Sequence, residues 1–106
     1  MYEYKATVIK VVDGDTLHLN IDLGFNINYN KQIIRLARIN APELSTTEGF
    51  NIKNIITDLL CNKQVTIKTI KDTKDKYGRY LAEVYLEDLN INDYLLTNEY
   101  AVSYLK

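Results

Sequence analysis

The sequence predicts an α+β fold, and three observations lead to this prediction. Short runs rich in β-branched residues recur along the chain, a run with helical periodicity follows the third of them, and a second helical signal lies near the C-terminus. The 106 residues suffice for one core, and no repeat or Pro/Gly/Ser-rich linker divides them. We therefore expect a single domain over residues 1–106.

The first two strands are expected on either side of a turn at Asp13-Gly14-Asp15. Residues 5–12 are rich in β-branched side chains, and Gly14 suits a turn because glycine tolerates positive φ. From residue 15 onward, apolar and polar residues alternate, which predicts a half-buried strand. The apolar face is expected to hold Leu17, Leu19, Ile21 and Leu23, and the polar face His18, Asn20 and Asp22.

The third strand is expected at residues 32–39, after an Asn-rich loop at 24–31. Alternation would place Ile33, Arg35, Ala37 and Ile39 on one face of this strand, and Ile34, Leu36 and Arg38 on the other. Pro42 ends the strand, because proline cannot donate a hydrogen bond to a ladder.

A helix is expected next, because residues 45–48 have capping-box spacing. The apolar residues that follow have the spacing of an amphipathic helix: Ile52, Ile55, Ile56, Leu59 and Leu60. Strands at 64–70 and 80–86 follow, joined by a polar connection at 71–79. Asn92 as N-cap, with Ile91 and Leu96 as a hydrophobic staple, predicts a short helix at 93–99.

The expected order is therefore β-β-β-α-β-β-α. Five short strands with one helix after the third, and a short C-terminal helix, match a five-stranded Greek-key β-barrel of the OB-fold type. Other α+β sheets share the same order of elements.

Composition excludes few functions. Thirteen basic residues against fourteen acidic ones leave a net charge of −1, so a polyanion would need a local basic patch or a bound cation. A single cysteine, Cys61, excludes an intrachain disulfide, and its apolar neighbours predict a core position. The N-terminus lacks the pattern of a signal peptide and no apolar run reaches the length of a membrane span, so we expect a cytoplasmic monomer with no membrane partner.

Two charged residues stand out because they are in phase with apolar positions of their strands. Asp15 is in phase with Leu17, where an ionised carboxylate needs a partner or a metal; the alternative is a solvated turn cap. Arg35 alternates with Ile33, and its guanidinium needs a carboxylate or a phosphate; the alternative is an arginine that extends from a barrel end into solvent.

Two further segments have the residue types of a binding site. Asn40-Ala41-Pro42-Glu43 offers amide, backbone and carboxylate oxygens, which suit a hard cation, although a polar turn has the same composition. Residues 68–79 hold five basic and two acidic residues, interleaved with Tyr77. This segment suits nucleic-acid binding or is a solvated loop.

The order of these motifs resembles the staphylococcal nuclease (thermonuclease-like) family. Asp-Gly-Asp-Thr follows the first strand, an arginine precedes Asn-Ala-Pro-Glu by five positions, and Tyr-Gly-Arg opens a late strand. The resemblance extends from the first strand to Tyr104. It implies the OB-type barrel and a metal-dependent nuclease that hydrolyses phosphodiester bonds in DNA and/or RNA with little sequence preference.

The resemblance also implies a role for each matching residue. The ligands of a Ca²⁺ ion would be Asp15, Asn40 and the carbonyl of Ala41. The catalytic residues would be Arg35, Glu43 and Arg79, with Glu43 as general base and the arginines as phosphate clamps. The residues that hold the terminal phosphate and base would be Lys76, Tyr77 and Tyr104.

Two positions depart from the family's pattern. Asn40 stands where many members have aspartate, which predicts weaker binding of the metal rather than none. Arg38 stands where many have glycine or an apolar residue, and its guanidinium would either repel the metal or contact a phosphate. These departures keep open an alternative function, a catalytically weak or inactive module that binds nucleic acid or a protein partner.

Overall fold

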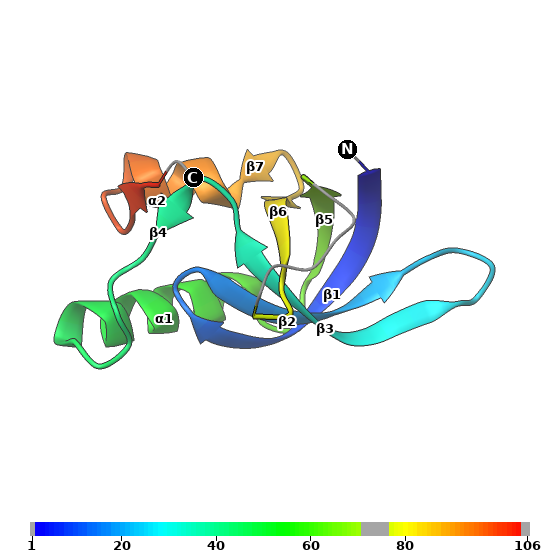
Figure 1. Cartoon of the computed structure of the whole chain (residues 1–106), viewed down its shortest axis with the longest axis horizontal. Helices are drawn as coiled ribbons and strands as arrows, with labels where there is room; N and C mark the ends of the chain where they lie inside the picture. The colour runs from blue at the N-terminus through cyan, green and yellow to red at the C-terminus, as the bar shows by residue number, and fades with distance from the viewer. Residues whose placement is uncertain (1, 71–76, 105–106) are drawn as a thin grey trace.

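The computed structural model describes residues 2–70 and 77–104, and its centre is a closed barrel of five strands (Figure 1). These strands are β1 (Tyr2–Asp13), β2 (Thr16–Asp22), β3 (Asn28–Leu36), β5 (Gln64–Thr69) and β6 (Tyr80–Leu86). Neighbours β1–β2, β2–β3, β1–β5 and β5–β6 are antiparallel, and a parallel pairing of β3 with β6 closes the barrel. The predicted five-stranded OB-type barrel is confirmed.

The remaining elements lie around this barrel. They are β4 (Ile39–Asn40), α1 (Thr47–Leu60), β7 (Leu89–Asn90), α2 (Ile91–Thr97) and β8 (Val102–Ser103). The two residues of β4 pair with β8 and lie outside the barrel sheet. The predicted helix after the third strand and the short C-terminal helix are both present. Neither helix in the described residues is long and apolar enough to cross a membrane.

The core follows the predicted alternation in β2 and the predicted helical period in α1. Leu17, Leu19 and Ile21 are buried, as are Ile52, Ile56 and Leu60 on the inner face of α1. The prediction is wrong for Leu23, which lies beyond the end of β2 and is 44% exposed. Cys61, expected in the core, is the C-cap of α1 and only half-buried.

The third strand differs from its prediction in both length and face. It begins at Asn28, because residues 28 and 29 pair with Asp22 and Ile21 across a hairpin whose turn is at Phe25–Asn26. Its buried face carries Ile34 and Leu36, whereas Ile33 and Arg35 are only half-buried. The strand then ends in a turn at Ala37–Arg38. This turn changes the alternation, so Ala37 and Ile39 are buried although they belong to the expected face of Arg35.

Both helices begin at other N-caps than predicted. Thr46, rather than Ser45, caps α1, and its hydroxyl oxygen accepts a hydrogen bond from the Gly49 amide at 3.0 Å. Asn90, rather than Asn92, caps α2, and its side-chain oxygen accepts from the Asp93 amide at 3.0 Å. Ile91 is therefore inside the helix and forms no staple.

Asn92 is fully buried because its side-chain amide binds backbone groups of the barrel. Its oxygen accepts from the Val84 amide at 3.0 Å, and its nitrogen donates to the Ala37 carbonyl at 2.8 Å. Capping propensity alone does not distinguish two asparagines two positions apart, and these tertiary hydrogen bonds decide which one is internal to the helix.

Candidate active site

A groove of about 910 Å³ gathers the predicted site residues. All of those that the structure describes line it: Asp15, Arg35, Asn40, Ala41, Glu43, Tyr77, Arg79 and Tyr104. They come from the β1–β2 turn, β3, β4, the connection to α1, the segment just before β6 and the segment after β8. Lys76 lies outside the described residues. Segments far apart in the sequence therefore form one surface.

Arg35 lines this groove and contacts two of the predicted metal ligands. Its Nη2 is 3.5 Å from Asp15 Oδ2 and 3.4 Å from Asn40 Oδ1, and its Nη1 donates to the Leu36 carbonyl at 2.6 Å. The Arg35 and Asp15 side chains are each 12% exposed. The expected anionic partner of this guanidinium is therefore a carboxylate of the same groove, and the arginine does not extend into open solvent.

Asp15 is held in place by hydrogen bonds to both carboxylate oxygens. Oδ1 accepts from the Thr16 hydroxyl at 3.2 Å, and Oδ2 accepts from the Ala41 amide at 3.0 Å. The backbone carbonyl of Asp15 accepts from the Leu36 amide at 2.8 Å, and the adjacent Thr16 pairs with Arg35 across β2 and β3. Strand register therefore places Asp15 beside both Arg35 and the Ala41 segment.

Two glycines let the connection between β4 and α1 approach this site. A Cβ on Gly14 would come within 2.7 Å of Ala41 Cβ, and a Cβ on Gly49 would overlap the Glu43 carbonyl oxygen. The prediction that Gly14 has a positive φ is wrong, because the glycines with positive φ are Gly24 and Gly78. No sequence pattern indicates the role of Gly49, which lies in the first turn of α1 against the backbone of Glu43.

Glu43 reaches the groove from the segment that enters α1. Glu43 is exposed to solvent. Its backbone carbonyl oxygen accepts hydrogen bonds from the Thr46 amide at 3.0 Å and from the Thr46 hydroxyl at 2.7 Å. Because Thr46 is also the N-cap of α1, the backbone of Glu43 is fixed to the start of the helix. The carboxylate is therefore solvent-accessible on a firmly held backbone.

The two tyrosines each lie near an arginine of the groove. The Arg79 guanidinium carbon is 4.9 Å from the centre of the Tyr77 ring, and that of Arg35 is 5.9 Å from the Tyr104 ring. These distances are those of cation–π contacts. Tyr104 is held from its backbone as well, since its amide donates to the Arg38 carbonyl at 2.8 Å.

Asp13 is a further acidic residue of the groove, and its place in a turn of the sequence did not indicate a role at the site. Its Oδ1 accepts a hydrogen bond from the Asp15 amide at 3.0 Å. Burial, and then the neighbouring Asp15 side chain, raise the pKa of the Asp13 carboxyl above its ordinary value of 3.8. Two acids in one partly buried site create a local preference for positive charge.

The oxygen atoms of the groove suit a hard cation. Among residues 2–70 and 77–104, no three His, Cys, Asp or Glu side chains cluster, so a metal here would be bound by mixed oxygen ligands. Carboxylate, amide and backbone oxygens are the set that Ca²⁺ accepts. Asp15 and Asn40 already direct oxygens to one cationic nitrogen, which shows that the two side chains can share a positive charge.

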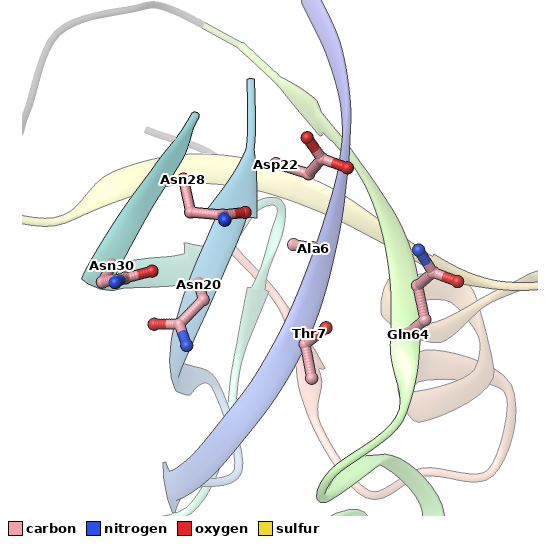
Figure 2. A pocket seen from close by; sticks show the side chains of 7 residues that line it. All are labelled: Ala6, Thr7, Asn20, Asp22, Asn28, Asn30 and Gln64. Carbon is pink, nitrogen blue, oxygen red and sulfur yellow. The ribbon is translucent and has the colours of Figure 1, made fainter. Parts of the chain in front are cut away.

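A second pocket, of about 290 Å³, contains none of these residues (Figure 2). It lies over β1, β2, β3 and β5 and is lined by Asn20, Asp22, Asn28, Asn30 and Gln64, together with Ala6 and Thr7. It therefore lacks the combination of arginines and paired acids that marks the groove.

Comparison with known proteins identifies the family. Residues 33–106 match the model of the staphylococcal nuclease homologue family. An uncharacterized endonuclease of Haemophilus influenzae is 42% identical over 86 residues, which are 80% of this chain and 44% of that protein. The micrococcal nuclease of Shigella flexneri is 33% identical over 85 residues, which are 78% of this chain and 43% of that protein.

The endonuclease YhcR of Bacillus subtilis is 32% identical over an alignment 115 positions long, which covers 96% of this chain but only 9% of that much longer protein. The chain thus spans less than half the length of each of these three relatives. The family match covers more than half of the chain and includes the second and third motifs of the groove. The chain belongs to the staphylococcal nuclease homologue family.

Proposed function

We propose that this domain is a Ca²⁺-dependent nuclease that hydrolyses phosphodiester bonds of DNA and/or RNA with little sequence preference. One observation carries the proposal: a single groove gathers three arginines, paired acids, a metal-compatible set of oxygens and two tyrosines. The relatives named as nucleases support the same activity. Stability of the barrel does not require all of these groups on one surface.

In this proposal Asp15, Asn40 and the carbonyl of Ala41 hold the Ca²⁺ ion. A bound Ca²⁺ supplies Lewis-acid polarisation of a phosphoryl oxygen. The Ala41 amide restrains Asp15 Oδ2, so the ligand set has a preferred geometry before the ion arrives. Asn40 contributes no formal charge, which lowers the expected affinity relative to an aspartate at the same position.

Arg35 and Arg79 bind the non-bridging oxygens of the scissile phosphate. A planar guanidinium suits this role because it offers several N–H groups in a fixed fork. Arg35 is held by the Leu36 carbonyl and by Asp15, which restrict its orientation before substrate binds. Negative charge increases at phosphorus during hydrolysis, so these cations stabilise the transition state more than the ground state.

Glu43 acts as the general base that accepts a proton from the attacking water. Its exposed carboxylate has access to solvent, and its backbone is anchored to Thr46. Tyr77 and Tyr104, beside the two arginines, bind the base and sugar next to the scissile phosphate, and Lys76 binds the terminal phosphate. Stacking on tyrosine tolerates any base, which agrees with low sequence preference.

A second candidate function is a module that binds nucleic acid without cutting it. The observation that favours it is Asn40, a neutral side chain at a proposed metal ligand. If the affinity for Ca²⁺ were too low for the metal site to be filled, the groove would bind the phosphate of a nucleic acid through Arg35 and Arg79 without hydrolysing the phosphodiester bond.

Cleavage of single-stranded DNA distinguishes these two functions. The substrate is incubated with the domain in millimolar Ca²⁺ or in a chelator, alongside Glu43→Ala and Arg79→Ala. Glu48→Ala is the matched control, because Glu48 is an exposed glutamate at the start of α1 that does not line the groove. We expect Ca²⁺-dependent cleavage that falls by about 10²–10³ in each groove variant and is unchanged in the control. Binding without cleavage at every Ca²⁺ concentration would instead establish the module.

A further inference from the structure

We propose that Arg38 is a positioning residue: with Glu83 and Asp93 it fixes the turn between β3 and β4, from which the groove's ligands emerge. The inference rests on the proposed nuclease function, because it concerns the geometry of that site. It replaces both roles considered for Arg38 in the sequence, repulsion of the metal and direct contact with a phosphate.

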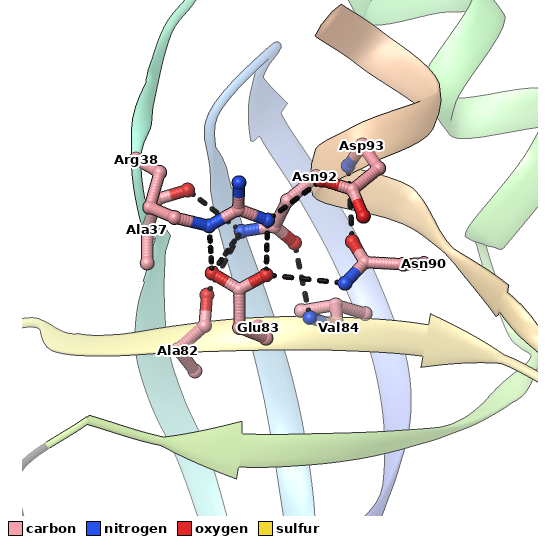
Figure 3. A network of polar contacts seen from close by, with 8 residues as sticks. All are labelled: Ala37, Arg38, Ala82, Glu83, Val84, Asn90, Asn92 and Asp93. Atoms are coloured by element: carbon pink, nitrogen blue, oxygen red, sulfur yellow. Dashed lines mark hydrogen bonds and ion pairs between the residues drawn. The ribbon is translucent and has the colours of Figure 1, made fainter. Parts of the chain in front are cut away.

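The Arg38 guanidinium is bound to carboxylates of the barrel and of α2 (Figure 3). Its Nε donates to Glu83 Oε2 at 2.9 Å, and its Nη2 lies 2.6 Å from Glu83 Oε1 and 2.8 Å from Asp93 Oδ1. The first two bonds form a bidentate pair, the strongest geometry for arginine and carboxylate. The Glu83 side chain is only 10% exposed, so loss of Arg38 would leave a nearly buried carboxylate without its cationic partner.

The backbone of the turn is bound from both sides as well. Arg38 has φ of 68°, in the left-handed region that disfavours residues with a side chain. The Ala37 amide donates to the Ala82 carbonyl at 2.8 Å, and the buried Asn92 side chain donates to the Ala37 carbonyl at 2.8 Å. On the other side, the Tyr104 amide donates to the Arg38 carbonyl at 2.8 Å. The side-chain network and these bonds together hold an unfavourable backbone conformation.

The groove depends on this turn because the turn leads directly into β4, whose other supports are the buried Ile39 side chain and the hydrogen bond from the Ala41 amide to Asp15. The two residues of β4 pair only with the two residues of β8, and a ladder of that length is weak by itself. Arg35 precedes Arg38 by three positions and Asn40 follows it by two. A change in the turn therefore alters the direction in which β4 presents Asn40, and moves Tyr104 with it.

The network also explains how a cation is tolerated so close to the proposed metal site. Arg38 itself lines the groove, and the two carboxylates that neutralise its charge do not. The repulsion expected from an unpaired guanidinium is thereby reduced. Of the two acids, Glu83 is the essential one, because Asp93 is 59% exposed and its ion pair is screened by solvent.

A double-mutant cycle tests the proposal with Arg38→Ala, Glu83→Ala and the combined variant. Ca²⁺ affinity is measured by calorimetry, and the exchange rate of the Tyr104 amide proton by hydrogen exchange. Cleavage is described by kcat and KM. We expect each single variant to weaken Ca²⁺ binding and kcat by about 10–100-fold, and to speed exchange of the Tyr104 amide. The double variant is expected to be no worse than the poorer single variant, because both remove one unit.

Three further variants complete the test. Arg38→Lys, which keeps the charge but loses the bidentate pair, is expected to recover part of the Ca²⁺ affinity. Glu83→Gln replaces Glu83→Ala if the latter does not fold. Glu3→Ala removes the exposed ion pair with Lys68, 3.8 Å long and away from the groove, and is expected to change none of the readouts.

Other results would overturn the proposal. If Arg38→Ala raised only KM, and Glu83→Ala had the KM and kcat of the wild type, Arg38 would bind the substrate directly. Additive losses in the cycle, or unchanged Ca²⁺ affinity and Tyr104 exchange in both single variants, would remove the positioning role. Calorimetry and hydrogen exchange do not require cleavage, so a wild-type domain that does not cut would refute the nuclease function while leaving this test intact.

Discussion

The substitution Gly49→Ala sets helix propensity against packing at the groove. Alanine in a helix is more favourable than glycine by about 1 kcal/mol, so propensity alone predicts a more stable domain. The structure predicts the opposite, because the new Cβ would overlap the Glu43 carbonyl oxygen and lie 2.8 Å from the Pro42 carbonyl oxygen. Both atoms are backbone, so neither can rotate away.

The magnitude follows from the balance of these effects. Overpacking against rigid neighbours costs about 1–3 kcal/mol, which equals or exceeds the gain in propensity. We therefore expect a net loss of up to about 2 kcal/mol, or a fall in Tm of up to roughly 8–16 °C for a domain of this size. The connection that carries Glu43 must also shift, and a displacement of about 1 Å can reduce a rate by about 10²-fold.

Thermal unfolding and Ca²⁺-dependent cleavage measure the two consequences. Asn54→Ala is the control, because Asn54 is an exposed residue of the same helix where alanine improves propensity without new contacts. We expect this control to raise Tm slightly and to leave cleavage unchanged. A Gly49→Ala domain that is more stable than the wild type and equally active would refute the steric argument.

Three further predictions concern charges in the groove. Asn40→Asp is expected to tighten Ca²⁺ binding about tenfold by calorimetry, and an unchanged affinity would mean that Asn40 is not a ligand. Arg35→Lys is expected to lower kcat by about 10²–10³ in the cleavage assay, because an ammonium cannot reproduce the guanidinium fork; equal rates would exclude Arg35 as a clamp. The raised pKa of Asp13 means that its ionisation opposes folding once the pH rises above 3.8, and the cost persists at neutral pH. Chelator-treated Asp13→Asn is therefore expected to be more stable than the wild type at pH 7 by urea unfolding, with a difference that disappears below pH 3.8, and a constant difference would contradict this.

Short-range patterns predicted most of the fold. The alternation in β2 and the helical period of α1 arise from the geometry of single elements. Residues 16–22 and 47–60 alone were therefore enough to predict them. The predicted alternation of β3 holds through Leu36 and fails at Ala37 and Ile39, because alternation lasts only while a strand continues. The turn at Ala37–Arg38 interrupts it, and hydrogen bonds to residues on β6 and α2 stabilise that turn.

The candidate site shows the same division. The motifs identified Asp15, Arg35, Glu43 and Arg79 individually, because each stands at a turn or strand end with a recognisable local pattern. Asp13 received no role, since its raised pKa depends on burial beneath other segments. Gly49 was equally invisible, because the carbonyl oxygen that excludes a Cβ belongs to a connection outside its own helix.

The sequence by itself determined the order of elements, the apolar faces of β2 and α1, and which residue types are available for phosphate and metal. Only the tertiary structure decided that Arg38 binds Glu83, a residue 45 positions away, and that one guanidinium contacts both Asp15 and Asn40. The physical reason is range: propensity and periodicity act over a few residues. Ion pairs, steric exclusion and strand register depend on groups that become neighbours only when the barrel closes.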